Sequence, residues 1–168
     1  KRYFGIETYT STHSEDLLLT HDYTGFGVSL TDKFEPQISN PGNMWDTILL
    51  EYIAGRRKKP VWIIGTAHYT GSSGGIDYLE NLFFLKEAKQ ENVLDALRQG
   101  RMYVRFNKLK DEPVILKEFA AKNMGSGSIQ IIIRGDSPSS SVPVNIEIIR
   151  NGKVFKRFEE TRNEWKII

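Results

Sequence analysis

Hydrophobic positions recur at helical spacing most clearly between residues 43 and 54. Pairs four residues apart, such as Trp45 with Leu49, place one apolar stripe along the segment, which is typical of an amphipathic helix. Asn43 is suited to cap the start of this helix, and Gly55 stands where a left-handed C-terminal cap is expected. The pattern therefore predicts a capped helix at this point of the chain.

Other apolar runs in the first two thirds of the chain predict strands and a second helix. Strand, helix, strand, helix, strand is the order of a parallel sheet with crossover helices, so residues 1–109 are expected to form an α/β region. Residues 10–43 lack clear periodicity, and only the leucine triplet Leu17–Leu19 indicates an anchored element there. The remaining expected elements are strands at Tyr3–Tyr9, 61–66 and Met102–Phe106, a short apolar run at Leu82–Leu85, and a helix at Asn92–Gln99 ended by Gly100.

The pattern changes after residue 110, where alternating apolar positions replace helical spacing. Asn151-Gly152 stands between two alternating runs and predicts a type I′ hairpin, because both positions of that turn need a positive φ. Residues 110–168 are therefore expected to form a separate, small antiparallel β module. Its predicted strands are Val114–Ala121, Ile129–Ile133, Val144–Ile149 and Val154–Phe158.

Composition and charge exclude several classes of function. The formal charge of +2 comes from 23 basic and 21 acidic residues, a balance that argues against a nucleic-acid partner. The absence of cysteine excludes disulfides and thiolate metal sites. No apolar run reaches the roughly 18 residues that a membrane span needs. The basic cluster 56–59 follows the predicted helix and is expected to complement its dipole while staying solvated.

The chemistry of the chain concentrates on its three histidines, His13, His21 and His68. The first two follow the strand at 3–9, and His68 follows the strand at 61–66. If the two strands are parallel, all three histidines emerge at the same end of the sheet, where ligands and metals are commonly held. Histidine and carboxylate are suitable ligands for zinc or manganese, and the loop after the first strand also carries the acidic residues Glu15, Asp16 and Asp22.

Four segments resemble, in order, one branch of the polymerase and histidinol-phosphatase (PHP) family of metal-dependent phosphoesterases. They are FGIETYT at 4–10, Trp45-Asp46 with Leu49-Leu50 and Gly55-Arg56, GTAHYTG at 65–71, and VLDALRQGRMYV at 93–104. The resemblance implies a partial β/α barrel followed by an immunoglobulin-like module. It also implies a phosphoester substrate and a divalent metal, zinc or manganese.

The same resemblance assigns roles to individual residues. His68 corresponds to the histidine of an Asp-x-His metal pair, and His13 and His21 are the other histidines that could join it. The aspartate of the pair is missing: one alignment pairs His68 with Thr70, and the other places Thr66 at the aspartate position. Thr66 and Thr70 would then position water or phosphate, and Glu7, the glutamate of the Gly-Ile-Glu strand, would orient a ligand.

The mismatches decide the expected function. The family's opening His-x-His pair is absent, so the chain resembles the C-terminal half of such a protein, with an upstream half of the same protein or a second copy as partner. We therefore expect a degenerate or truncated phosphoesterase that is not catalytic by itself. The alternative is a non-catalytic binding or interaction protein that uses the C-terminal β module. Divalent-metal binding together with phosphatase activity in a longer form of the protein would favour the first hypothesis. Absence of both, with binding by residues 110–168 alone, would favour the second.

Overall fold

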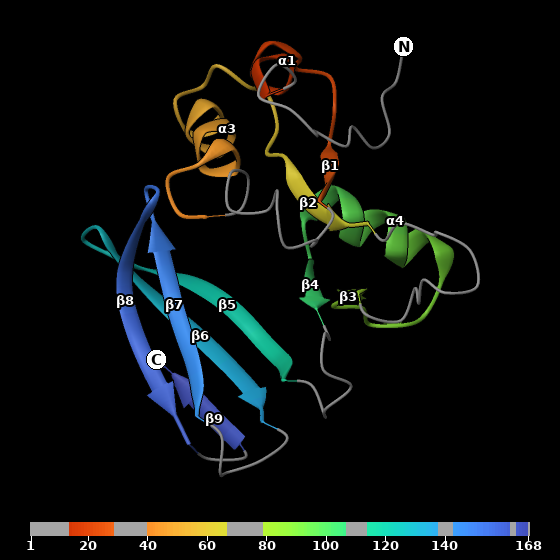
Figure 1. The fold of residues 1–168 in the computed structure, drawn as a ribbon. Helices are drawn as coiled ribbons and strands as arrows, with labels where there is room; N and C mark the ends of the chain where they lie inside the picture. The colour runs from red at the N-terminus through yellow and green to blue at the C-terminus, as the bar shows by residue number, and fades with distance from the viewer. Residues whose placement is uncertain are drawn as a thin grey trace, which may run out of the picture. The chain divides into compact units, whose positions relative to one another are not determined.

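The computed structural model describes residues 14–28, 40–66, 79–106, 114–137, 143–161 and 164–167. The chain divides into two compact units (Figure 1). The first comprises Lys1–Lys108 with Arg150–Lys153, and the second comprises Leu109–Ile149 with Val154–Ile168.

The centre of the first unit is a strand–helix–strand motif made by β1 (Gly25–Val28), α3 (Met44–Ile53) and β2 (Trp62–Gly65). β1 and β2 are parallel, with Phe26 opposite Ile63. Side chains on one face of the pair form a core with α3 and the short helix α1 (Ser14–Leu19). The buried members of this core are Leu17, Phe26, Val28, Ile48 and Val61.

Helix α3 confirms the predicted amphipathic helix, although its start is capped differently from the expectation. Asn43 occupies the N-cap position without a side-chain cap hydrogen bond. The carboxylate of Asp46 instead accepts the N–H of Gly42 at 2.6 Å. The predicted left-handed glycine after the helix is confirmed, because Gly55 has a φ of 75°.

A second part of the first unit contains β3 (Leu79–Phe83), α4 (Gln90–Gln99) and β4 (Met102–Phe106). The two strands are antiparallel, with Asn81 opposite Val104. Asn81 connects this hairpin-like pair to β2, since its side-chain amide accepts the N–H of Gly65 at 2.8 Å and donates to the Gly65 carbonyl at 2.9 Å. Gly100, in the left-handed conformation, ends α4 and lies against the ring of Trp62.

The second unit is antiparallel. A three-stranded sheet has the order β5 (Ile115–Gly125), β6 (Ser128–Asp136), β9 (Glu164–Ile167), and a two-stranded sheet holds β7 (Val144–Arg150) and β8 (Lys153–Glu160). Both sheets contribute to one core around buried Ile133, Trp165 and Ile167, so the unit has sandwich character. Gly135 lies opposite Trp165, and a Cβ there would be 2.3 Å from the indole, so the strand needs glycine at this position.

The predicted partial β/α barrel followed by an immunoglobulin-like module is wrong as a description of the described residues. Only β1 and β2 are paired in parallel there; β3 and β4 are antiparallel, and the strands fall into small separate sheets instead of one closed ring. The alternation of strand and helix along the chain was correct for 61–66, 92–99 and 102–106. The predicted parallel pairing holds for β2 but not for β4, which pairs antiparallel with β3, because pairing is decided by contacts distant in sequence.

Candidate functional site

The carboxyl end of the β1–β2 pair is where the sequence predicts ligands. Thr66 follows β2 directly, and its N–H donates to the Val28 carbonyl at 2.9 Å. Its side chain lies over Gly27, where a Cβ would be 2.6 Å from the Thr66 methyl group. The Thr66 hydroxyl is buried and has no hydrogen-bond partner among the described residues. This uncharged hydroxyl could position a bound group, but it cannot supply the negative charge of the missing aspartate.

His21 lies at the opposite end of the same strand pair. It is exposed, precedes β1, and is close enough to Glu51 near the end of α3 for its charge to act on that carboxyl. Four strand residues separate the two ends, which corresponds to about 13 Å at the usual rise per residue. Metal ligands lie about 2 Å from the ion, so His21 and Thr66 do not fit one metal site.

The other predicted site residues, Glu7, His13, His68 and Thr70, lie outside the described residues. Within the part of the chain that the structure describes, no group of three histidines or acidic residues could hold a metal ion. The described members of the predicted set, His21 and Thr66, are therefore not brought together. The premise that all three histidines share one end of a sheet does not hold for His21.

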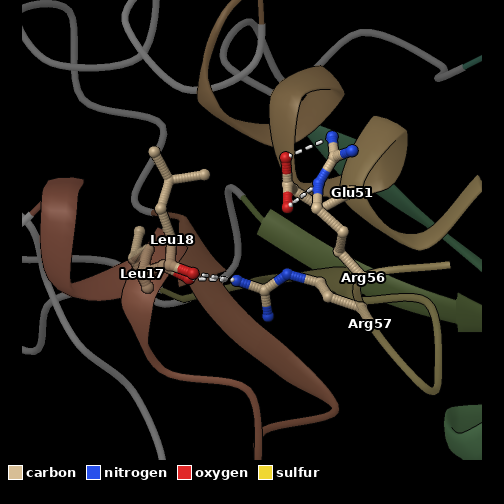
Figure 2. Close-up of polar contacts among 5 residues, drawn as sticks. All are labelled: Leu17, Leu18, Glu51, Arg56 and Arg57. Atoms are coloured by element: carbon tan, nitrogen blue, oxygen red, sulfur yellow. Dashed lines mark hydrogen bonds and ion pairs between the residues drawn. The ribbon is translucent and has the colours of Figure 1, made fainter. Parts of the chain in front are cut away.

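Arg57 is a buried charged residue whose role the sequence pattern did not indicate. Arg57 is only 3 % exposed, although the basic cluster 56–59 was expected to be solvated. Figure 2 shows its guanidinium directed at the carbonyl groups that end α1. Nη2 donates to the carbonyls of Leu17 and Leu18 at 2.6 and 2.9 Å, and Nη1 donates to that of Thr20 at 2.9 Å. Arg57 thus satisfies carbonyls that a helix C-terminus leaves without partners.

Tyr23 joins Arg57 in a polar cluster of the first unit. The Tyr23 hydroxyl donates to the Leu17 carbonyl at 2.5 Å, and the Arg57 guanidinium lies 5.2 Å from the centre of the Tyr23 ring. Burial raises the pKa of Tyr23, against an opposing effect of the Arg57 charge and hydrogen bond. This arrangement fixes α1 on β1 and β2, and it has the character of a structural brace.

Arg56 and Glu51 form a separate, exposed pair beside this brace (Figure 2). Both guanidinium nitrogens, Nε and Nη2, donate to the carboxylate, at 2.6 and 2.7 Å. The hydrogen bond from Arg56 lowers the pKa of Glu51; desolvation opposes this effect, and the charges of Arg56, Arg57 and His21 add smaller lowering contributions. Two consecutive arginines therefore have different surroundings, and no local pattern distinguishes them.

The second unit offers an exposed strand edge. Among the described residues, β5 pairs only with β6, on one side. Phe119 lies opposite the buried Ile133, yet Phe119 itself is 60 % exposed. Ile129 and Met124, near the turn between the two strands, are 66 % and 56 % exposed. The apolar face of this sheet therefore continues past the core to an edge with which no described strand pairs.

A shallow cavity of about 190 Å³ lies in the first unit. It is lined by Leu85, Lys86, Asn92, Asp95 and Arg101. Asp95 and Arg101 form an ion pair, so their charges are already matched. The cavity is smaller than the roughly 300 Å³ at which small-molecule pockets begin, and it does not contain any of the predicted site residues.

No helix among the described residues is long and apolar enough to cross a membrane. When the chain is compared with family models, with curated proteins and with solved structures, none of them matches.

Proposed function

We propose that this chain is a non-catalytic interaction protein whose second unit binds an extended polypeptide strand along the edge of β5. The observation that carries the proposal is the coincidence of an 11-residue strand paired on one side, among the described residues, with exposed apolar side chains along it. Strand addition to a sheet edge is a common mode of recognition, in which main-chain hydrogen bonds give affinity and alternate side chains give specificity.

The centre of the β5 edge, unlike its flanks, lacks the charges with which proteins usually protect an edge. Protected edges are short, charged or covered, because unpaired N–H and C=O groups invite association. β5 is the longest strand of the second unit, and its central residues Phe119, Ala120 and Ala121 are uncharged. Its charged side chains, Lys117, Glu118 and Lys122, flank that apolar centre. This layout would favour a partner strand with a small or apolar centre and charges beside it.

The proposal predicts that ten-residue peptides selected from a displayed library for binding to the full chain will bind at β5. Phe119→Lys should weaken binding of the selected peptides at least tenfold, because it places a charge where an alternate side chain would dock. Phe155→Lys is the matched control, since Phe155 is exposed to almost the same degree, 61 % against 60 %, but lies on β8. Peptide affinities measured by calorimetry check the prediction. Equal loss in both variants, or no peptide binding, would contradict the proposal.

The metal chemistry implied by the PHP resemblance leads to a separate prediction. His21 and Thr66 lie at opposite ends of the strand pair, and a divalent site of useful affinity needs about three protein ligands. We expect the chain to bind zinc and manganese no more tightly than about 100 µM and to leave a generic phosphomonoester unhydrolysed. Calorimetric titration with each metal checks this. Micromolar binding that disappears in His68→Ala would show that a site survives and would reverse the expectation.

A further inference from the structure

We infer that the strand recognised by β5 is β5 of a second copy of this chain, paired antiparallel about a two-fold axis through Ala120. This inference rests on the proposed function, because it names the partner of the same edge. A two-fold pair joins two edges of the same sequence, so every residue faces a partner whose number is fixed by the position of the axis.

The faces of β5 limit the registers that are available. Phe119 and Ala121 lie opposite Ile133 and Ile131 on the core-facing side, whereas Glu118 lies opposite Arg134 on the other side. Residues directly opposite in an antiparallel pair point to the same face, so the core-facing residues of one copy must meet those of the other. This condition allows only registers that differ from one another by steps of two residues.

One of these registers pairs the charges. With the axis at Ala120, Glu118 faces Lys122 of the second copy, and the symmetry makes this contact twice. A shift by two residues in either direction places Glu118 opposite Ala120 or Met124. A shift by four places either two glutamates or two lysines face to face, which is destabilising. The charges of the strand thus favour one alignment over its neighbours.

The intramolecular contacts leave those charges ready for such a pairing. Glu118 already forms an ion pair with Arg134, with 3.1 Å between Oε2 and Nε, and the Glu118 side chain remains 36 % exposed. Lys117 is held by Asp136 at 2.5 Å. Lys122 lies opposite the neutral Gln130 and has no ion-pair partner among the described residues. In the dimer, Glu118 would lie between Arg134 of its own copy and Lys122 of the other.

The apolar face is completed by the same alignment. Phe119 of each copy comes to lie opposite Ala121 of the other, where the small side chain leaves room for the ring. Two irregularities in the pairing with β6, at Lys117 and Met124, bound the regular stretch of β5. Because the axis passes through Ala120, they confine the contact to residues 118–122, so the pairing has a defined length and does not extend into an open-ended ribbon.

A single cysteine tests the register directly, because the chain has no cysteine of its own. In Ala120→Cys the two Cα atoms would be about 4.5–5.5 Å apart, within the range of a disulfide. In Ala121→Cys the two thiols face Phe119 of the other copy and are separated by two residues along the strand, beyond that range. Mild oxidation of the full chain is expected to give a covalent dimer of Ala120→Cys at least tenfold faster than of Ala121→Cys.

A charge exchange tests the same contact in solution. Sedimentation of the wild type should show a species twice the 19.3 kDa chain mass at high concentration. Lys122→Glu should raise the dissociation constant about tenfold, because glutamates then face each other twice, and the double variant Glu118→Lys/Lys122→Glu should restore much of the affinity. The dispersion of backbone amide signals in an NMR spectrum checks that each variant remains folded.

The outcomes separate this inference from the proposed function. A wild type that stays monomeric at millimolar concentration, or equal cross-linking of Ala120→Cys and Ala121→Cys, overturns pairing with a second copy. If selected peptides still bind in a Phe119-dependent way, recognition of a strand at β5 stands with another partner. If the peptides also fail to bind, the proposed function falls with it.

Discussion

Arg57→Met is expected to lower the free energy of unfolding of the first unit by about 3 kcal/mol, because it leaves three carbonyl groups without their charged donor. The carbonyls belong to Leu17, Leu18 and Thr20, and the Arg57 residue that serves them is 3 % exposed. Water cannot readily replace the guanidinium at such a site. Helix α1 should therefore separate from the core and open the contact of Leu17 with the strands.

The neighbouring arginine provides a matched control. Arg56→Met removes the same charge one residue away, but its side chain is 60 % exposed and pairs with a surface carboxylate, so the change in stability should be small. Arg57→Lys should recover only part of the loss, since one ammonium cannot reproduce the planar fork that reaches the three carbonyls. Hydrogen exchange of the amides in α1 and β1, followed with thermal unfolding, measures the effect. Equal destabilisation by Arg56→Met and Arg57→Met would contradict the assignment of Arg57 as the cap.

Local signals in the sequence predicted those elements whose ends are fixed by their own residues. Asn151 and Gly152 have φ values of 52° and 72°, as the hairpin prediction required. Gly100 ends α4 at a φ of 66°, and β4 occupies the predicted residues Met102–Phe106. In each case the conformation depends on a turn or cap within a few residues, so the sequence pattern and the structure agree.

Contacts between distant residues could not be predicted in the same way. Arg57 lies 40 residues from the Leu17 carbonyl that it binds, and nothing in the run Arg56-Arg57-Lys58-Lys59 distinguishes the buried member from the exposed ones. The pairing direction of β3 and β4 is likewise set by their contacts and not by the alternation of each strand. The PHP resemblance joined four local motifs, and local motifs do not determine how strands close into a sheet.

The candidate site illustrates the same limit. The sequence correctly placed Thr66 after a strand, but it placed His21 at the wrong end because β1 was not recognised between His21 and the helix α3. The segment Gly25–Val28 contains two glycines, which weaken the strand pattern. Those glycines are needed because the Trp62 carbonyl oxygen lies against Gly25 and the Thr66 side chain fills the space over Gly27. A strand whose glycines are explained only by its neighbour cannot be identified from its own residues.

Trp165→Ala is expected to unfold the second unit while the first remains folded. Trp165 is 5 % exposed and lies in the core with Ile133 and Ile167. Its indole N–H donates to the Ser137 hydroxyl at 3.2 Å, and its ring fills the space above Gly135. Truncation of a buried tryptophan costs about 3–5 kcal/mol. A unit near the ~60-residue size at which a single core is marginal has little stability to lose, so this cost should exceed its reserve.

The three tryptophans allow the two units to be followed separately. The indole N–H groups of Trp45 and Trp62 donate to carbonyls of the first unit. In an NMR spectrum of Trp165→Ala, these indole N–H signals should therefore keep their native positions. In the same spectrum, the backbone amide signals of β5 to β8 should move to the chemical shifts typical of an unfolded chain. Phe155→Ala removes an aromatic ring that is 61 % exposed and should leave the second unit folded. Loss of the Trp45 and Trp62 signals together with those of β5 to β8 would show instead that the two units unfold as one, because the core around Trp165 would then support residues beyond its own unit.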